Sequence, residues 1–220
     1  MERDLNKFMR EQYVIPIRVI NRLSKKKRYR LLDIGASKKF LKRFLPKNVR
    51  YYSLDYVGKH DWVFDLEKGK LPIKNGFFDI VVCLETLEHI TNPEKVMEEM
   101  LRIGKKDAIF ILSMPNDYNF VLRFYYLIGK KTKMHEPFRT VAEHLHIHVP
   151  RVKDIINFFS EYIKIEEVYY GWSSRTALRA SGLSGEILKV IDGFINQLAK
   201  IYPSLFSRLV SVWGRRKEGN

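Results

Sequence analysis

Short apolar runs alternate along this chain with longer segments in which apolar residues recur at helical spacing. The runs Ile80–Leu84 and Ala108–Leu112 are continuously apolar, which is typical of strands covered on both faces of a sheet. Strands are predicted over 30–34, 50–55, 79–84 and 108–113, with later ones near 163–171 and 208–214. Helices are predicted over 38–46, 93–103, 150–161 and 184–200. This alternation predicts an α/β fold with a doubly wound, mostly parallel sheet and helices on both faces.

Three segments lie outside the simple alternation. Residues 1–24 are predicted to form an amphipathic helix that Pro16 interrupts or kinks. Residues 114–143 carry an aromatic cluster followed by a basic stretch, and residues 172–207 place another amphipathic helix before the last strand. The last two segments are expected to cover a substrate pocket as lid-like insertions. Ordinary packing helices are the alternative.

Composition narrows the class of protein. With 220 residues, 45% of them hydrophobic, the chain is expected to form one domain over 1–220. Cys83 is the only cysteine, so a disulfide framework or a thiolate metal site cannot be built. No apolar stretch reaches the roughly 20 residues of a spanning helix, and the charged N-terminus lacks a signal peptide, so a cytoplasmic location is expected. The formal charge of +15 favours anionic partners, and an anionic membrane surface is one of them.

Three acidic residues follow predicted strands at the spacing of a nucleoside site. Asp33 precedes the turn at Gly35, Asp55 comes twenty residues after that glycine, and Asp65 follows the short run that begins at Trp62. A dinucleotide fold would need further glycines, where this chain has Ser37 and Phe40, and there is no phosphate-cradling loop. An acid directly before the turn suits an ammonium better than phosphates. The expected ligand is an adenosine that carries an amino acid.

These motifs resemble the class I S-adenosylmethionine-dependent methyltransferases, in particular the branch with type 11 and type 23 domains. Residues 31–37 look like the family's first motif, 76–90 like its fourth strand and exit loop, and 143–150 like the segment that passes the substrate side. The resemblance implies a seven-stranded Rossmann-like sheet, a cofactor-binding core over 29–171 and an antiparallel last strand over 208–217. It also implies S-adenosylmethionine as the cofactor.

When this sequence is matched to the family's motifs residue by residue, the resemblance implies which residues contact each part of the cofactor. The methionine part would contact Asp33, Gly35 and Ser37; the ribose Asp55 and Tyr56; the adenine Asp65 and Leu66; and the inner face Leu84 and Glu85. One departure concerns the first motif, where Ser37 and Lys39 replace the usual second and third glycines. Lys39 suggests that the following helix begins further from the cofactor than usual.

The exit loop offers a second set of candidate residues. Glu85, Glu88 and His89 have a spacing that looks like that of the small-RNA 2′-O-methyltransferases, in which a metal polarises the terminal ribose. Three histidines at 144, 146 and 148 alternate with aliphatic residues and would share one face if extended. Our interpretation assigns no metal ligand and takes His89 or His146 as a general base. A metal site that includes these residues stays an open alternative.

The leading functional hypothesis is a methyltransferase acting on an oxygen or nitrogen atom of a small-molecule or lipid-linked acceptor. One alternative is a metal-assisted RNA 2′-O-methyltransferase, which the positive charge favours. Another is a non-catalytic protein that keeps the cofactor fold and docks through its basic or amphipathic surfaces. The Asp/Asn-Pro-Pro-aromatic signature of many methyltransferases that modify base amino groups is absent after the fourth strand.

Overall fold

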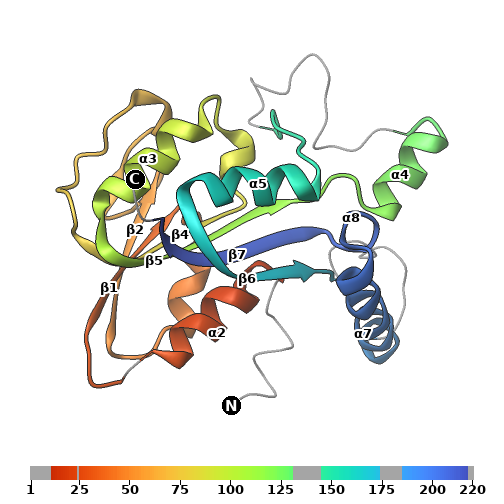
Figure 1. The fold of residues 1–220 in the computed structure, drawn as a ribbon, viewed down its shortest axis with the longest axis horizontal. Coiled ribbons are helices and arrows are strands. Elements are labelled where there is room, and N and C mark those ends of the chain that lie inside the picture. The colour runs from red at the N-terminus through yellow and green to blue at the C-terminus, as the bar shows by residue number, and fades with distance from the viewer. Residues whose placement is uncertain (1–10, 24, 131–144, 174–184, 218–220) are drawn as a thin grey trace.

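The computed structural model describes residues 11–23, 25–130, 145–173 and 185–217, which form one seven-stranded sheet (Figure 1). Its order is β3-β2-β1-β4-β5-β7-β6. Neighbours from β3 to β5 pair in parallel, whereas β7 pairs antiparallel with both β5 and β6. The strands are β1 (Tyr29–Ile34), β2 (Val49–Asp55), β3 (Trp62–Val63), β4 (Phe78–Leu84), β5 (Gly104–Pro115), β6 (Ile163–Gly171) and β7 (Leu209–Arg216). The predicted fold class, including the antiparallel last strand, is confirmed.

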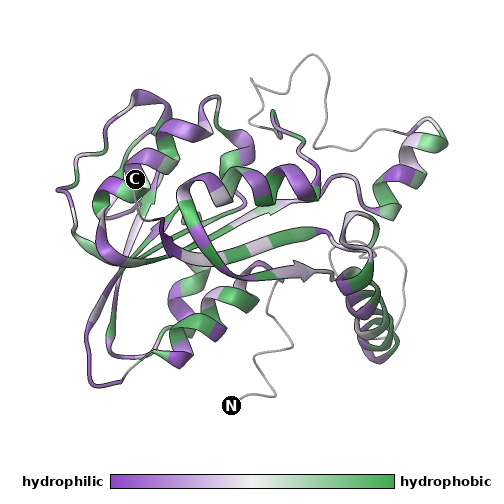
Figure 2. Ribbon diagram, viewed as in Figure 1, coloured by the Kyte–Doolittle hydropathy of each residue, from purple (hydrophilic) through white to green (hydrophobic). Residues whose placement is uncertain are grey.

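Helices cover both faces of the sheet. In Figure 1, α3 (Pro93–Ile103) and α5 (Val152–Tyr162) lie on one side, and α2 (Val14–Arg22) lies on the other. Each face has its own buried apolar cluster. Successive strand residues alternate between the two clusters, so Leu31 belongs to the α2 side and Leu32 to the α3 side. The central strands have no solvent-facing side, which explains their unbroken apolar runs, drawn in green in Figure 2.

Local signals explain why α3 is the helix that the sequence predicts best. The Asn92 side chain accepts a hydrogen bond from the Lys95 backbone N–H. Pro93 occupies the first helical turn, where a backbone N–H would have no acceptor within the helix, so the missing N–H of proline costs no hydrogen bond. Gly104 follows the last helical residue. The observed bounds, Pro93–Ile103, equal the predicted ones.

Two predicted helices differ from the structure. The helix predicted over 38–46 is wrong, because only a short 3₁₀ helix, η2 (Phe40–Phe44), forms there. Ser37 and Lys39 precede it with left-handed backbone angles, φ 43° and 54°, and a left-handed residue cannot belong to a right-handed helix. The second difference is at Pro16, which falls in the first turn of α2 after the 3₁₀ helix η1 (Glu11–Tyr13). Because backbone N–H groups in a first turn have no intrahelical acceptor, Pro16 does not break α2.

The two predicted insertions contribute helices at one end of the sheet. These are α4 (Phe120–Leu127), α7 (Gly185–Ile201) and α8 (Pro203–Phe206), which lie together at the right of Figure 1. Buried Asn116 joins their bases, since its side-chain amide donates to the Ser207 carbonyl at 2.8 Å. Residues 131–143 and 174–184 of these insertions lie outside the described residues. None of the helices among the described residues has the length and hydropathy needed to cross a bilayer.

The core predicts a simple stability test. Phe110 in β5 is fully buried, so Phe110→Ala should lower the free energy of unfolding by about 3–5 kcal/mol through lost burial and cavity formation. The matched control is Phe124→Ala in α4, where the side chain is 57% exposed and little change is expected. Urea unfolding followed by circular dichroism measures both. Equal losses for the two variants would contradict the burial assigned to Phe110.

Candidate functional site

Two neighbouring cavities open where the parallel strands end. One, of about 440 Å³, lies along the ends of β2 and β4, and the other, of about 320 Å³, lies beside β1 and the N-terminal segment. Gly35 and Glu85 line both. The first cavity also contains Asp55, Tyr56, Asp65 and Leu66, and the second contains Asp33, Ser37 and Leu84. All nine residues predicted to contact a cofactor therefore line one cavity or the other.

The turn after β1 brings the backbone close to both cavities. Gly35 has a φ of +68°, and a Cβ atom there would lie 2.2 Å from the Thr86 hydroxyl oxygen. Only glycine meets both the left-handed angle and the close contact. The Gly35 N–H donates to the Leu54 carbonyl at 2.9 Å, which joins the turn to the end of β2.

Asp55 holds two loops together. Its carboxylate accepts hydrogen bonds from the backbone N–H groups of Ser37 and Tyr56, each at 2.8 Å. One oxygen takes each bond, and each carboxylate oxygen can accept a second. The same side chain can therefore fix the loop after β1 and still accept hydroxyl groups of a ligand.

Asp33 has a very different environment from Asp55. Its carboxylate is buried and accepts a hydrogen bond from the Tyr51 hydroxyl at 2.7 Å. Burial raises the pKa of Asp33 to about 7; the Tyr51 bond acts in the opposite direction and the nearby charge of Asp55 adds to the rise. A cation in the second cavity would stabilise the ionised form of Asp33.

The far end of the first cavity is formed by Asp65 and the residues around it. Asp65 begins the 3₁₀ helix η3 (Leu66–Lys68), and its carboxylate accepts a hydrogen bond from the Glu67 N–H at 3.0 Å. Phe64 and Leu66 flank it and supply apolar wall. This part of the cavity therefore combines an apolar wall with the acidic side chains of Asp65 and Glu67.

Two histidines meet beside the first cavity. His89, at the end of the 3₁₀ helix η4 (Leu87–His89), lines the cavity, and its Nδ1 lies 3.1 Å from the Leu145 carbonyl oxygen. His146 lies behind it, with Nδ1 2.7 Å from an Asp117 carboxylate oxygen, and the two rings are 5.0 Å apart. The described part of the histidine stretch is irregular with a bend at Ile147, and His144 lies outside the described residues.

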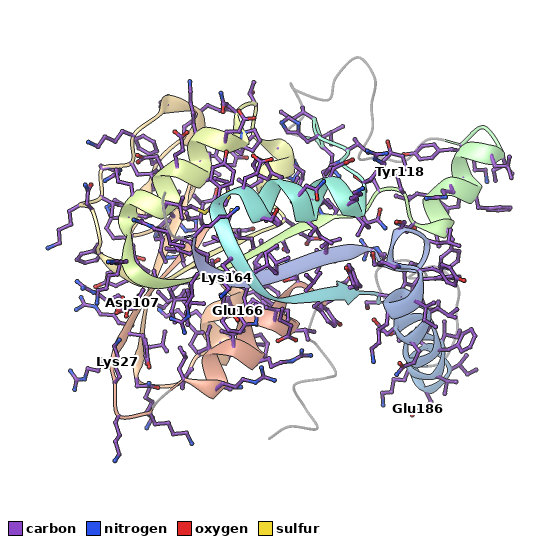
Figure 3. All side chains as sticks on the ribbon, in the orientation of Figure 1. Lys27, Asp107, Tyr118, Lys164, Glu166 and Glu186 are labelled. Atoms are coloured by element: carbon purple, nitrogen blue, oxygen red, sulfur yellow. The ribbon has the colours of Figure 1, made fainter. Side chains whose placement is uncertain are left out.

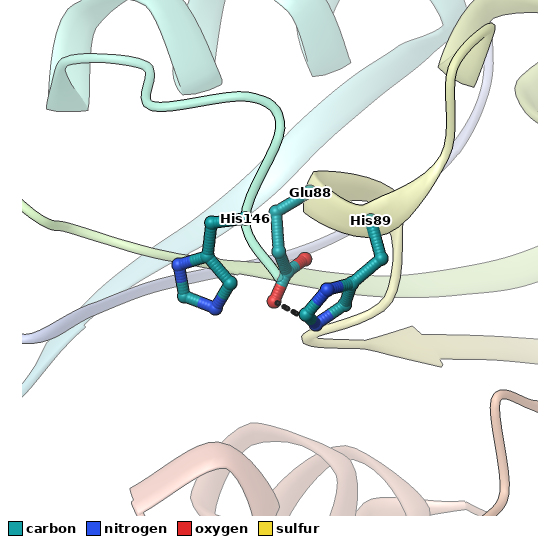
Figure 4. A group of neighbouring side chains, drawn as sticks. All are labelled: Glu88, His89 and His146. Atoms are coloured by element: carbon teal, nitrogen blue, oxygen red, sulfur yellow. Dashed lines mark ion pairs between the residues drawn. The ribbon is translucent and has the colours of Figure 1, made fainter. Parts of the chain in front are cut away.

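Glu88 is the unusual member of this group. Its side chain is fully buried, and neither carboxylate oxygen has a hydrogen-bond partner among the described residues. Figure 4 shows the carboxylate between the rings of His89 and His146, 3.8 Å from Nε2 of His89. Burial raises the pKa of Glu88 well above its usual value; the nearby backbone N–H of Glu88 itself acts in the opposite direction, and the charges of Glu85 and Asp117 add to the rise.

The family of the chain follows from comparison with known proteins. A family model described as "Methyltransferase domain" matches residues 5–162, well over half of the chain. The chain belongs to this methyltransferase family. A curated relative, norajmaline N-methyltransferase from Rauvolfia serpentina, is 46% identical over 44 residues, which are 20% of this chain and 15% of the relative. That match thus spans a small part of the relative's length.

Solved structures agree with the methyltransferase fold. A Thermotoga maritima protein, described as a SAM-dependent methyltransferase and possible histamine N-methyltransferase, has a TM-score of 0.56 at 15% identity, with 98% of each chain covered. A Mesorhizobium loti S-adenosylmethionine-dependent methyltransferase has a TM-score of 0.54 at 14% identity, covering 93% of this chain and 98% of that one. At these identities the likeness concerns the fold, and the predicted class I methyltransferase domain is confirmed.

The residues of this methyltransferase fit the cofactor that the fold family implies. Asp33 offers a buried carboxylate for an ammonium group, and Asp55 offers acceptors for hydroxyl groups. Phe64 and Leu66 offer an apolar wall for a planar base. Gly35 and Glu85 line both cavities, so one ligand could extend from one cavity into the other.

Several site residues of the methyltransferase were missed from the sequence. Tyr51 donates a hydrogen bond to Asp33, Thr86 packs against Gly35, and Gln12 and Tyr13 line the second cavity. None of these carries a local signal, because each acts across elements. Asp117 could have been found, since it is an acid close to the carboxyl end of β5, as Asp33 and Asp55 are close to the carboxyl ends of β1 and β2.

The raised pKa of Asp33 predicts a pH dependence of stability. In the unfolded chain its pKa returns to the usual 3.8, so between about pH 4 and 7 the folded state binds the extra proton. The free energy of unfolding should therefore fall as pH rises through this window, by at most about 4 kcal/mol from this group. Asp33→Asn removes that contribution.

Urea unfolding between pH 5 and 8 measures the slope. The wild type should lose stability more steeply than Asp33→Asn, whereas Asp107→Asn, at an exposed position, should behave as the wild type does. Identical slopes for all three proteins would contradict the environment assigned to Asp33.

Proposed function

We propose that this methyltransferase transfers a methyl group from S-adenosylmethionine to an oxygen or nitrogen atom of a small-molecule or lipid-linked acceptor. The observation that carries the proposal is the pair of cavities that meet at Gly35, with Asp33 in one and Asp55 in the other. A ligand with an ammonium end and a ribose would occupy both. The short match to norajmaline N-methyltransferase supports nitrogen as one acceptor atom.

Each part of the cofactor has proposed partners in the chain. Asp33 and Ser37, with Leu84, would hold the amino-acid end in the second cavity. Asp55 and Tyr56 would contact and orient the ribose. Asp65 and Leu66 would contact the adenine, and Glu85 would contact the inner face of the ligand. When bound, S-adenosylmethionine supplies a methyl group on a positively charged sulfur. The chain's own contribution is alignment and the exclusion of water.

We assign the catalytic groups of the acceptor side to His89 and His146. His89 lines the first cavity, and the Asp117 carboxylate beside Nδ1 of His146 favours a proton on that nitrogen. Nε2 of His146 is then the nitrogen able to take a proton from an acceptor that arrives protonated. Asp117 orients the ring and acts as a positioning residue.

An apolar acceptor is supported by the exposed faces of the two insertions. Leu127 in α4 and Val190 and Phe194 in α7 are 83%, 73% and 66% exposed. Single exposed apolar side chains are ordinary, but these three belong to two helices, α4 and α7, that both lie at the right of Figure 1, at the end of the sheet where β5 stops. A lipid-linked acceptor, or peripheral contact with an anionic membrane, would cover this surface and match the charge of +15.

The proposal is tested by calorimetric titration of S-adenosylmethionine, and of its demethylated product, into the wild type and Asp55→Ala. We expect binding to the wild type, weakened in the variant by about 1–3 kcal/mol, because hydrogen bonds to a charged acceptor are lost. Part of that loss arises through the backbone of Ser37 and Tyr56, so the thermal stability of the variant is measured alongside.

Asp107→Ala is the matched control. Asp107 lies near the start of β5, far from Tyr118, which follows the strand's carboxyl end (Figure 3). Its substitution should leave the affinity unchanged. If the wild type binds neither ligand, the proposed function is wrong and the non-catalytic alternative takes its place.

A further inference from the structure

We infer that Glu88, His89 and His146 form a binding site for one divalent transition-metal ion. The three residues each offer one ligand atom, and these atoms all lie within 4.8 Å of one another (Figure 4). Two imidazoles and one carboxylate are a donor set that first-row metals such as Zn²⁺, Fe²⁺ and Co²⁺ accept. Binding of the ion does not depend on the proposed function, but its use in methyl transfer does.

The first supporting observation is that the buried carboxylate of Glu88 lacks hydrogen bonds among the described residues. A fully buried carboxylate normally receives hydrogen bonds that compensate its lost hydration. Both oxygens of Glu88 lack them among the described residues, and the nearest basic group, Nε2 of His89, is 3.8 Å away, beyond hydrogen-bond distance. A cation between Glu88 and the two rings would supply the missing compensation.

The second observation concerns the two imidazole rings. The Leu145 carbonyl oxygen near Nδ1 of His89 can only accept, so that nitrogen carries the hydrogen and Nε2 keeps its lone pair. The Asp117 carboxylate, 2.7 Å from Nδ1 of His146, has the same effect on the second ring. Histidines that bind metals are oriented by such carbonyl and carboxylate partners. Both rings are therefore prepared to donate through Nε2.

The backbone fixes the elements that carry the three ligands. Ile147 and His148 donate their N–H groups to the Glu88 carbonyl at 2.9 and 3.1 Å, so the segment after 145 is held against η4. Ligand atoms around a metal at roughly 2.1 Å lie about 3–3.5 Å apart, somewhat closer than 4.8 Å. Binding of the ion therefore requires the three side chains to draw closer together.

A three-residue site leaves coordination positions open. His89, Leu145 and Ile147 line the first cavity, so the open positions border that cavity, beside the place proposed for the ribose and the adenine. Water or an acceptor oxygen could fill them, and the metal would polarise that oxygen as a Lewis acid. In that case His89 and His146 serve as ligands and not as bases, and the acceptor atom is oxygen.

The test uses the full chain, without an affinity tag, stripped by a chelator and titrated with Co²⁺. Visible absorption reports coordination of Co²⁺, and calorimetry gives the affinity. The wild type should bind one equivalent with a new visible band. Glu88→Gln and His146→Ala should weaken binding at least tenfold and lose the band, and Asp117→Asn should weaken it by about 10–100-fold through loss of the orienting partner.

His148→Ala is the matched control, because His148 belongs to the same segment but its Nε2 lies 2.8 Å from the Ile90 carbonyl oxygen, outside the cluster. It should bind Co²⁺ as the wild type does. Glu88→Gln keeps the shape of the side chain and removes a buried charge, so it should fold even if His146→Ala does not. Thermal unfolding with and without Co²⁺ checks this, and only proteins with an intact site should be stabilised.

Two results would overturn the inference: no saturable Co²⁺ binding to the wild type, or equal binding by wild type and Glu88→Gln. Titration of S-adenosylmethionine into the stripped protein separates this failure from that of the proposed function. Cofactor binding without metal binding would refute the metal site alone. Metal binding without cofactor binding would support the site and refute the proposed function.

Discussion

The parallel pairing of β1 with β2 on one side and β4 on the other is the constraint on which the site depends. In this register Asp33 lies beside Ser53 and Val82, so the three strands end at one edge of the sheet. Residues that are 50 positions apart in the sequence thereby line the same cavities. The candidate contacts on β1, β2 and β4 and in the turns that follow them depend on this alignment, and the helices on either face shield the strands from water.

Three aspartates that look alike in the sequence have three different physical roles in the fold. Asp55 accepts hydrogen bonds from two backbone N–H groups, Asp65 begins a 3₁₀ helix, and Asp33 is buried and accepts a hydrogen bond from a tyrosine hydroxyl. Spacing alone could predict that all three stand near a ligand. It could not predict which would have a raised pKa, because the rise at Asp33 comes from burial and from the nearby charge of Asp55, against the opposing effect of the Tyr51 bond.

The elements that could be predicted are those with strong local patterns. Short apolar runs, two of them continuous, predicted six strands to within four residues, and the helix-compatible segment over 93–103 predicted α3. The helix predicted over 38–46 failed because Ser37 and Lys39 adopt left-handed angles, a property of the turn that the residue types do not reveal. The burial of Glu88 was equally hidden, since it results from the docking of residues 145–148, more than 50 positions later in the chain, against η4.

The hydrogen bonds of Asn116 connect two excursions of the chain that are distant in sequence. Its backbone N–H donates to the Arg208 carbonyl at 2.8 Å, and its side-chain amide donates to the Ser207 carbonyl. The start of the segment that follows β5 is therefore bound to the end of the segment that precedes β7. The two segments therefore form one structural unit, which extends from the antiparallel pair β5 and β7 and lies away from Asp33 and Asp55. Changes in the sequence of this unit could alter what the protein recognises while the opposite half of the sheet remains the same.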